Sequence, residues 1–414
     1  TTLKPLNRVL VTGIGAVTPL GGNARESWRK LVEGQTGVCA IRDPAILEKK
    51  FSSKVAASLP LEVKERFLGK KGPLSPLFVQ YALDSAEEAL GDANLLEMTD
   101  LEKSRCGVAI GSGIGNIEEI AQNTRIMDTK GARRISPYFV TNILTNMAAG
   151  HVSLRHGLRG PQHACSTACA TGANSIGDAY RLIQNGDADI MIAGGTEASV
   201  TPLSFAGFSQ MRALSTHFND TPSHSSRPFD SQRDGFVIGE GAGVIVLESY
   251  KHAMKRGARA YCEVKGYGLS SDAYHVTAPS PDGRGAQACM LAALREGGEE
   301  LGNIDYLNAH ATSTPLGDRI EAFAISKVFS PLDSKIPYVS SSKGAIGHTL
   351  GAAGAIEGIF AILALSEGVI PPTLNLKQPE ASVEGWADDE MPGLDPLRHV
   401  GNTALELRGG NKLN

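Results

Sequence analysis

The sequence predicts an α/β protein built from two similar halves. Short apolar runs that end in glycines alternate along the chain with segments of helical spacing. Two segments, 161–195 and 336–370, repeat one order of strand, reactive residue and helix rich in Gly and Ala, with His348 at the position of Cys169. Small residues around such a helix permit close packing on all sides. We therefore expect each half to aim a buried helix at one shared active site.

The individual elements follow from local patterns, taken in chain order. Apolar, β-branched runs predict strands at 8–17, 106–115, 188–197 and 243–249. Helical spacing predicts helices at 75–90 and 136–154, the second long and apolar. A polar helix near residues 250–260 marks the expected boundary between halves 1–255 and 256–414.

Composition narrows the classes of function. The 414 residues suggest two domains, and 40 Lys and Arg against 44 Asp and Glu give a net charge of −4. This balance offers no broad basic field for nucleic acid or an anionic membrane surface. The apolar runs are too short and too rich in glycine to span a bilayer, so no membrane insertion is expected. Six cysteines without a CxxC pair indicate free thiols in a reducing compartment. Because Thr1 is first, we expect an upstream segment to have been removed.

Cys165 and Cys169 lie where a strand gives way to a helix. Cys169 directly precedes "ATGANSIGDAYRLI", so it is placed at a helix start, where the macrodipole and free N–H groups favour a thiolate and lower the pKa of the thiol. Cys165 lies four residues earlier, inside the expected strand. Free cysteines are usually buried structural thiols. The local pattern leaves both a nucleophile and a structural thiol open for Cys169.

Two histidines are the candidate partners of a nucleophilic cysteine, which needs help with protons or with an oxyanion. His310 ends the apolar strand "IDYLNAH", and His348 lies in "SSSKGAIGHTLGAAGAIEG". Both positions are strand ends or helix starts, where active sites of α/β folds gather. The glycine loops at 12–17 and 111–116 lack the acidic residue of a dinucleotide site, and no His/Cys cluster has zinc spacing. No cofactor is expected.

Three blocks together resemble the active-site segments of a known family. They are "STACATGA" around Cys169, "NAHATSTPLGD" at 308–318 and "SSSKGAIGHTLGAAGAIE" at 340–357. They resemble the β-ketoacyl–acyl carrier protein synthases, and most of all the elongating enzymes of type II fatty acid synthesis of the mitochondrial kind. The resemblance covers residues 8 to about 376. It implies a thiolase-like fold of two duplicated α/β halves, layered with buried helices between mixed sheets. It also implies a homodimer in the mitochondrial matrix, with plastid or bacterial cytoplasm as alternatives.

The resemblance also implies a reaction. Cys169 accepts an acyl group from the phosphopantetheine arm of an acyl carrier protein. Malonyl carrier protein then loses carbon dioxide, and the resulting enolate extends the acyl chain by two carbons. His310 and His348 match the residues that stabilise the negative charge.

Seven further residues match positions of that family. Lys343 is expected to pair with Glu321 and to organise the site. Thr312 and Thr314 match threonines that hold the pantetheine arm, and Ile114 matches a residue that limits or gates the acyl pocket.

Glu357 and Asn308 match ligands of a structural cation in some relatives.

The C-terminal tail departs from the family. The usual ending contains a Gly-Phe-Gly-Gly-Thr-Asn turn, whereas residues 398–414 read "RHVGNTALELRGGNKLN". We expect "HVGNTALEL" to pair as a last strand if the tail is ordered, "RGG" to form the following turn, and Arg408 to point to solvent. The tail keeps open an impaired enzyme or a non-catalytic partner subunit. A thiolase or another coenzyme A condensing enzyme is a further alternative, disfavoured by the block "NAHATST".

Overall fold

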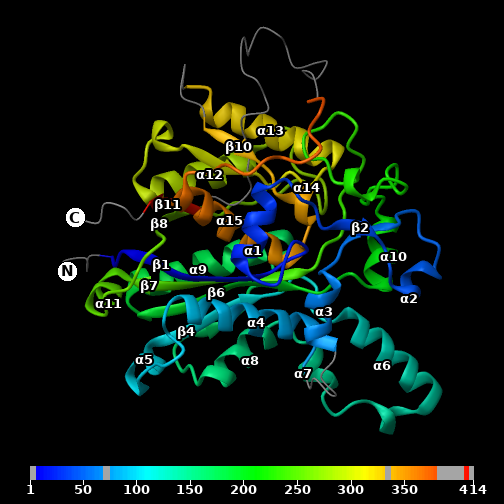
Figure 1. Cartoon of the computed structure of the whole chain (residues 1–414), viewed down its shortest axis with the longest axis horizontal. Helices are drawn as coiled ribbons and strands as arrows, with labels where there is room; N and C mark the ends of the chain where they lie inside the picture. Colours follow the sequence, from blue (N-terminus) through cyan, green and yellow to red (C-terminus); the bar gives the residue numbers. More distant parts are fainter. Residues whose placement is uncertain (1–5, 69–74, 332–336, 380–404, 410–414) are drawn as a thin grey trace.

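The computed structural model describes residues 6–68, 75–331, 337–379 and 405–409. A seven-stranded mixed sheet lies at its centre, in the order β11-β8-β1-β7-β6-β4-β5 (Figure 1). Its strands are β1 Val9–Val17, β4 Cys106–Gly111, β5 Gln162–His163, β6 Ile190–Glu197, β7 Gly241–Ser249, β8 Cys262–Tyr267 and β11 Leu405–Gly409. β4 runs parallel to β5 and β6, and the remaining pairs are antiparallel. Two small sheets pair β2 Val38–Ala40 with β3 Val55–Ala57, and β9 Tyr306–Asn308 with β10 Tyr338–Ser340.

The helices form layers around this sheet. α4 and α8 cover one face, α9 and α15 cover the other, and α12 and α13 lie beyond them against β8, β9 and β10 (Figure 1). The helices are α1 Ala24–Val32, α2 Pro44–Leu47, α3 Leu61–Leu68, α4 Leu77–Asp92, α5 Asp100–Arg105, α6 Ile117–Lys130, α7 Phe139–Ile143, α8 Met147–His156, α9 Thr171–Asn185, α10 Pro202–Gln210, α11 Tyr250–Lys255, α12 Arg284–Gly297, α13 Pro315–Phe329, α14 Lys343–Ile346 and α15 Ala353–Glu367. The predicted α/β fold with buried helices is confirmed.

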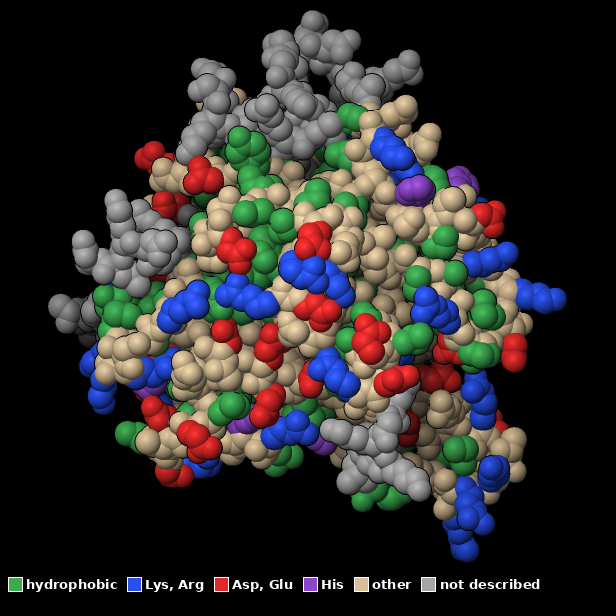
Figure 2. All heavy atoms as spheres, viewed as in Figure 1, with side chains coloured by type: hydrophobic (Ala, Val, Ile, Leu, Met, Phe, Trp, Pro, Cys, Tyr) green, Lys and Arg blue, Asp and Glu red, His purple; other side chains and the backbone are tan. Residues whose placement is uncertain are grey.

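Central strands are buried on both faces, which explains why they read as continuous apolar runs. In β6, Ile190 and Ile192 pack against the layer of α4 and α8, whereas Met191 and Ala193 pack against α9 and α15. Lys and Arg are interspersed with Asp and Glu on the face shown in Figure 2.

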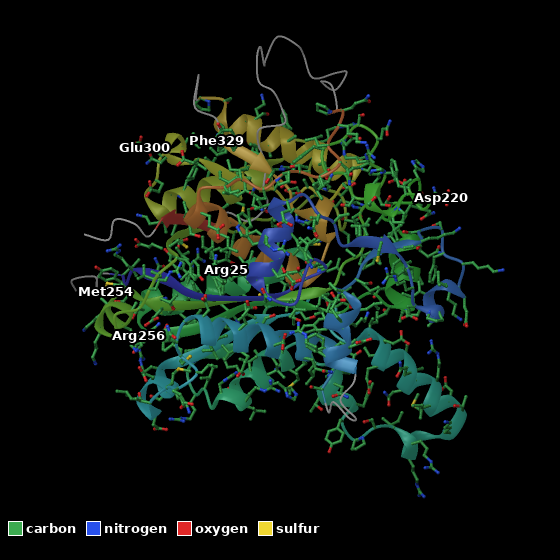
Figure 3. All side chains as sticks on the ribbon, viewed as in Figure 1. Arg25, Asp220, Met254, Arg256, Glu300 and Phe329 are labelled. Carbon is green, nitrogen blue, oxygen red and sulfur yellow. The ribbon has the colours of Figure 1, made fainter. Side chains whose placement is uncertain are left out.

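The predicted halves are joined by direct contacts. β8, from the second half, pairs with β1 over Val9–Val11. Arg25 of α1, labelled in Figure 3, donates to Glu367 at 2.8 Å and to the Tyr261 hydroxyl at 2.9 Å. The boundary between 255 and 256 stays a prediction.

The helices α9 and α15 approach each other through glycines in a reciprocal contact. A Cβ atom on Gly172 would lie 2.7 Å from the Ala355 nitrogen, and one on Gly354 would lie 2.8 Å from the Ala173 Cβ. Each glycine therefore admits the alanine that follows the other. This reciprocity supports the predicted internal repeat.

The register of that repeat differs from the prediction. A one-turn 3₁₀ helix precedes each long helix, and its first residue, Ala168 or Leu350, has a φ of 51°. Cys169 therefore corresponds to Gly351, and the prediction that His348 occupies its position is wrong. The two repeated segments therefore correspond through the turn that starts each helix, and not through their reactive residues.

The prediction of one helix over 136–154 is also wrong. Leu144 has extended backbone, with φ −71° and ψ 123°, and separates α7 from α8. α8 buries Ala148, Ala149 and Val152, whereas Val140 in α7 remains 59% exposed. An apolar run alone does not show which of its residues reach the core.

One helical stretch, Leu350–Glu367, is long and apolar enough to cross a membrane, and 67% of it is buried inside the protein. Its contacts with α9 and with the sheet account for this composition. We interpret it as a core helix.

The tail supplies the last strand of the sheet. β11 pairs antiparallel with β8, from Leu405 opposite Tyr267 to Gly409 opposite Cys262. The expected strand is confirmed only over its last three residues, Leu405–Leu407, and the expected turn is wrong at Arg408 and Gly409, which belong to the strand. Residues 398–404, Gly410 and the direction of the Arg408 side chain lie outside the described part of the structure.

Candidate active site

Cys169 lies in the 3₁₀ turn Ala168–Ala170, directly before α9. Its sulfur is 2.9 Å from Nε2 of His348, although the two residues are 179 positions apart. The sulfur of Cys165 instead contacts the Ser175 hydroxyl at 3.2 Å and the Thr171 carbonyl at 3.3 Å. The structure thus brings Cys169 to a histidine and turns Cys165 toward the helix.

His310 and His348 face each other beside the sulfur. Their ring centroids are 5.2 Å apart and their planes are nearly perpendicular, at 86°. The ligand atoms of Cys169, His310 and His348 all lie within 4.8 Å of one another. Three such atoms could hold a metal ion, or could surround the sulfur and oxygen of a thioester.

Both histidines are neutral. Burial lowers the pKa of His310 and of His348 well below the usual range, and the positive charge of Lys343 adds to this effect. A neutral imidazole has one N–H donor and one acceptor nitrogen. Each ring can therefore donate a hydrogen bond without carrying a charge.

The tautomer of His348 follows from its backbone neighbour. The Leu350 N–H donates to Nδ1 at 3.3 Å, so Nδ1 is the acceptor and Nε2 carries the proton. Phe236 packs edge-on against this ring, with centroids 5.4 Å apart. The Nε2–H group is thereby aimed at the sulfur of Cys169.

The pKa of Cys169 differs from the expectation. Burial raises the pKa of the thiol to about 11, and the charge of Lys343 is the largest opposing influence. The prediction of a lowered pKa is therefore wrong, because the cost of removing a thiolate from water exceeds the help from its surroundings. A raised pKa favours the thiol over the thiolate at neutral pH.

Lys343 is paired with a different carboxylate from the one predicted. Its ammonium group is buried and donates to Glu357 of α15, which also accepts from the Ser342 hydroxyl at 3.5 Å. Glu321 instead accepts the N–H groups of His310 at 3.0 Å and Ala311 at 2.7 Å. Burial also raises the pKa of Glu321 to about 8, and the charge of Lys343 is among the influences that oppose this rise. Glu321 orders the backbone at His310.

The predicted cation ligands have separate contacts. Glu357 is neutralised by Lys343, and the amide group of Asn308 donates to the Tyr306 hydroxyl at 3.0 Å. Among the described residues, the buried Oδ1 of Asn308 has no hydrogen-bond partner, which fits an oxygen ligand. The structural cation stays a prediction.

The predicted substrate-binding residues line two loops. Thr312 and Thr314 follow β9, and their hydroxyl oxygens are 3.1 Å apart. Ile114 lies in the loop after β4 and packs against an apolar cluster that includes Phe205 and Leu350. Their roles toward substrate stay predictions.

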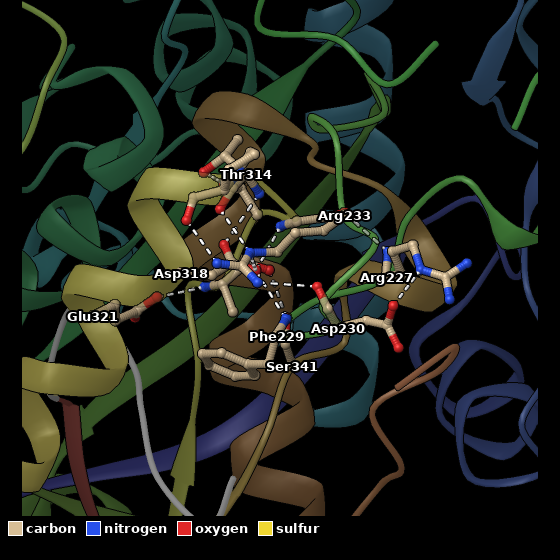
Figure 4. Close-up of polar contacts among 12 residues, drawn as sticks. Arg227, Phe229, Asp230, Arg233, Thr314, Asp318, Glu321 and Ser341 are labelled. Carbon is tan, nitrogen blue, oxygen red and sulfur yellow. Dashed lines mark hydrogen bonds and ion pairs between the residues drawn. The ribbon is translucent and has the colours of Figure 1, made fainter. Parts of the chain in front are cut away.

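A buried network that the sequence patterns did not reveal fixes the threonine loop (Figure 4). The carboxylate of Asp318 accepts the N–H groups of Phe229 at 2.9 Å, Ser313 at 3.2 Å and Thr314 at 3.2 Å. Arg233 donates to the Thr314 carbonyl at 3.0 Å. The available signal was an acidic residue in the first turn of a helix, a position that favours capping contacts.

Comparisons with known proteins match most of the chain. Residues 6–253 match the model of the Beta-ketoacyl synthase, N-terminal domain, and residues 261–377 that of the C-terminal domain. The mitochondrial 3-oxoacyl-[acyl-carrier-protein] synthase of Arabidopsis thaliana is 52% identical over 392 residues, 90% of this chain and 85% of that protein. The 3-oxoacyl-[acyl-carrier-protein] synthase 2 of Rhizobium meliloti is 46% identical over 414 residues, 97% of this chain and 95% of that protein.

A solved structure extends the similarity to the fold. A type II PKS acyl-carrier protein in complex with its ketosynthase superposes with a TM-score of 0.83 at 31% identity, covering 97% of this chain and 94% of that one. Both domain models, the relatives and the fold agree. The chain belongs to the β-ketoacyl synthase family.

Proposed function

We propose that the chain catalyses the decarboxylative Claisen condensation of an acyl thioester with malonyl–acyl carrier protein, which extends a fatty acyl chain by two carbons. The observation that carries this proposal is one buried thiol, Cys169, beside two neutral imidazoles, His310 and His348. The names of the Arabidopsis and Rhizobium relatives support the same activity.

In the first half-reaction, the sulfur of Cys169 attacks the carbonyl carbon of the acyl thioester. A bond forms between that carbon and the Cys169 sulfur, and the bond to the pantetheine sulfur breaks. The thiol proton ends on the departing pantetheine sulfur. His348 already carries its proton on Nε2, so it acts as a hydrogen-bond donor and not as a base.

In the second half-reaction, malonyl carrier protein loses carbon dioxide and leaves an enolate. Its oxygen accepts the N–H groups of His310 and His348, which act as preorganised oxyanion donors. The enolate carbon attacks the acyl group on Cys169, so a carbon–carbon bond forms, the carbon–sulfur bond breaks and Cys169 leaves as a thiolate. This thiolate takes one proton from water and returns to the thiol. Neutral donors can hydrogen-bond both the uncharged oxygen of the thioester and the negatively charged oxygen of the enolate, because the two histidines lose no proton in the cycle.

The direct test is a condensation assay with acyl and malonyl thioesters on acyl carrier protein. We expect release of carbon dioxide, a β-ketoacyl product two carbons longer, and an acyl adduct on Cys169 in mass spectrometry. Parallel reactions with the coenzyme A thioesters test the thiolase alternative. Faster turnover of the coenzyme A substrates would contradict the proposal. An unacylated Cys169 would favour the non-catalytic subunit.

The proposed partner is the acyl carrier protein, and we propose that its pantetheine arm contacts Thr312 and Thr314. A ketosynthase of similar fold forms a complex with such a carrier, which supports the partner. Thr312→Val and Thr314→Val should raise KM for the acylated carrier protein. An unchanged KM in both variants would contradict the contact.

We also propose a homodimer. Among the described residues, β5 is the edge strand of the large sheet at the end opposite β11, and an edge strand can pair with another chain. Tyr138 and Val140, at the start of α7, are 51% and 59% exposed. Sedimentation of the purified chain should give twice the monomer mass, and Val140→Glu should lower the dimer fraction.

We propose a mitochondrial location from the mitochondrial relative, although a bacterial relative is similarly close. Fractionation of the source cells tests this location.

The altered tail is tested by grafting Gly-Phe-Gly-Gly-Thr-Asn in place of residues 407–412. Unchanged or lower turnover in a folded graft would count against an impaired tail.

A further inference from the structure

Glu197 is a fully buried carboxylate at the end of β6, outside the residues that the proposed reaction uses. It accepts the Ser112 hydroxyl at 2.9 Å, the Gly113 N–H at 2.9 Å and the Gly351 N–H at 3.0 Å. The N–H groups of Ile114 and Gly115 also point to it, at 3.3 Å. One side chain thus joins the loop after β4 to the turn before α15.

Every one of these partners is a donor. Burial raises the pKa of Glu197, and these donors oppose the rise because they favour the ionised carboxylate. Successive N–H groups of one loop form an anion-binding nest. Replacing the carboxylate would leave buried N–H groups without an acceptor, which is costly. The loop and the turn therefore hold their present positions only while the carboxylate is there.

The contact reaches both sides of the candidate site. Gly351 follows Leu350, whose N–H donates to Nδ1 of His348, so consecutive amides hold Glu197 and the histidine. On the other side lies Ile114, the predicted gate of the acyl pocket. The Gly113 carbonyl accepts the Ser166 hydroxyl at 3.2 Å, which ties the same loop to the segment of the nucleophile.

The space around the carboxylate is closed. A Cβ atom on Gly113 would lie 2.9 Å from Oε2 of Glu197, and one on Gly351 would lie 2.4 Å from the Gly113 nitrogen. Neither segment can move toward the other. A change at Glu197 must therefore displace the Ile114 loop, the His348 turn, or both.

We infer that Glu197 is a positioning residue that couples the Ile114 loop to the turn of His348, so that the acyl pocket and the oxyanion donor keep one arrangement around Cys169. This inference rests on the proposed function. It predicts that the malonyl half-reaction depends on Glu197 more than acylation does, because the charge that develops on the enolate oxygen depends more on the direction of the His348 N–H than the attack by Cys169 does.

The test is Glu197→Gln, which keeps the shape but places an NH₂ group against N–H donors. We expect the rate of malonyl decarboxylation to fall roughly 10-fold relative to acylation of Cys169, within the 100-fold that a displacement of about 1 Å can cost. Glu197→Asp restores the charge and should recover part of this ratio.

A second readout needs no acyl or malonyl substrate. The negative charge of Glu197 raises the pKa of Cys169, although less than burial does. Alkylation of Cys169 by iodoacetamide at pH 10 should therefore be faster in Glu197→Gln than in the parent. This readout separates failure of the inference from failure of the proposed function, since the latter shows as an inactive parent.

The matched control is Glu248→Gln. Glu248 is equally buried and hydrogen-bonded, but it lies opposite Ile190, at the other end of β6. It should lose stability without a change in the ratio or in the alkylation rate at pH 10. If Glu197→Gln behaves like this control, Glu197 is only structural and the inference is overturned. If Glu197→Gln does not fold, Ser112→Ala removes one donor and must shift the ratio in the same direction, or the inference fails.

Discussion

The starts of α9 and α15 follow the same backbone path but carry different chemistry. Ala168 and Leu350 each open a single 3₁₀ turn with a φ of 51°. The next residue is Cys169 in the first half and Gly351 in the second. The first turn presents a sulfur, whereas the second presents an N–H that donates to Glu197. The repeated geometry is a scaffold, and one side chain decides which half attacks.

The two turns are not interchangeable. A Cβ atom on Gly351 would lie 2.4 Å from the Gly113 nitrogen, so position 351 of the second turn cannot hold a side chain while the loop after β4 stays in place. The second half compensates by placing His348 just before its turn, where it reaches the sulfur at 2.9 Å. The nucleophile and its donor thus come from different positions of the same repeat.

The largest effect is expected from a substitution that removes the side chain of Cys169, which distinguishes the first turn from the second. Cys169→Ala should abolish the acyl-enzyme, because it removes the sulfur that lies 2.9 Å from Nε2 of His348. Cys165→Ala is the control and should retain acylation, since its sulfur faces Ser175. Mass spectrometry after incubation with acyl carrier protein measures both. Acylation that persists in Cys169→Ala and disappears in Cys165→Ala would reverse the assignment.

The next largest effect is expected from substitutions that remove the hydrogen-bond donors of the second half. His310→Ala and His348→Ala should each slow malonyl decarboxylation by roughly 10²-fold or more, the scale of one lost oxyanion donor. Acylation of Cys169 should be slowed less, because it does not generate the enolate. Release of labelled carbon dioxide gives the first rate and adduct formation the second. Parental decarboxylation in both variants would exclude the role.

A smaller effect tests the contact between the two helices. Gly172→Ala and Gly354→Ala should each lower the free energy of unfolding by about 1–3 kcal/mol, the usual cost of overpacking. Gly207→Ala in α10 is the control, because a Cβ atom there meets nothing within 4 Å. Urea denaturation measures all three. If the two helix variants are as stable as Gly207→Ala, the close reciprocal contact is not present.

The sequence predicts the strands well because their patterns are local. β1, β4, β6 and β7 are buried on both faces, so they appear as apolar runs wherever the chain is read. The split between α7 and α8 is not predictable in this way. It depends on which apolar residues find neighbours, and Val140 and Leu144 do not reach the core.

The candidate site shows the same limit at longer range. Strand ends and helix starts correctly indicate where Cys169, His310 and His348 lie, and their roles remain to be tested. The partner of Lys343 and the contacts of Glu197 depend on packing between distant segments: Glu197 and Gly351 are 154 residues apart. Burial also reverses the expected direction for Cys169, since a helix start by itself predicts a lowered pKa and the packed interior raises it.

The smallest effect decides between those two expectations for Cys169. Only the thiolate reacts with iodoacetamide, so below the pKa the rate increases about tenfold for each pH unit. With a pKa of about 11, alkylation of Cys169 should keep rising through pH 10 without a plateau. A pKa lowered by the helix start would instead give a plateau below pH ~8. Rates measured in Cys165→Ala, which removes the neighbouring thiol, should show the continuous rise, and a plateau near neutral pH would mean that the helix start outweighs burial.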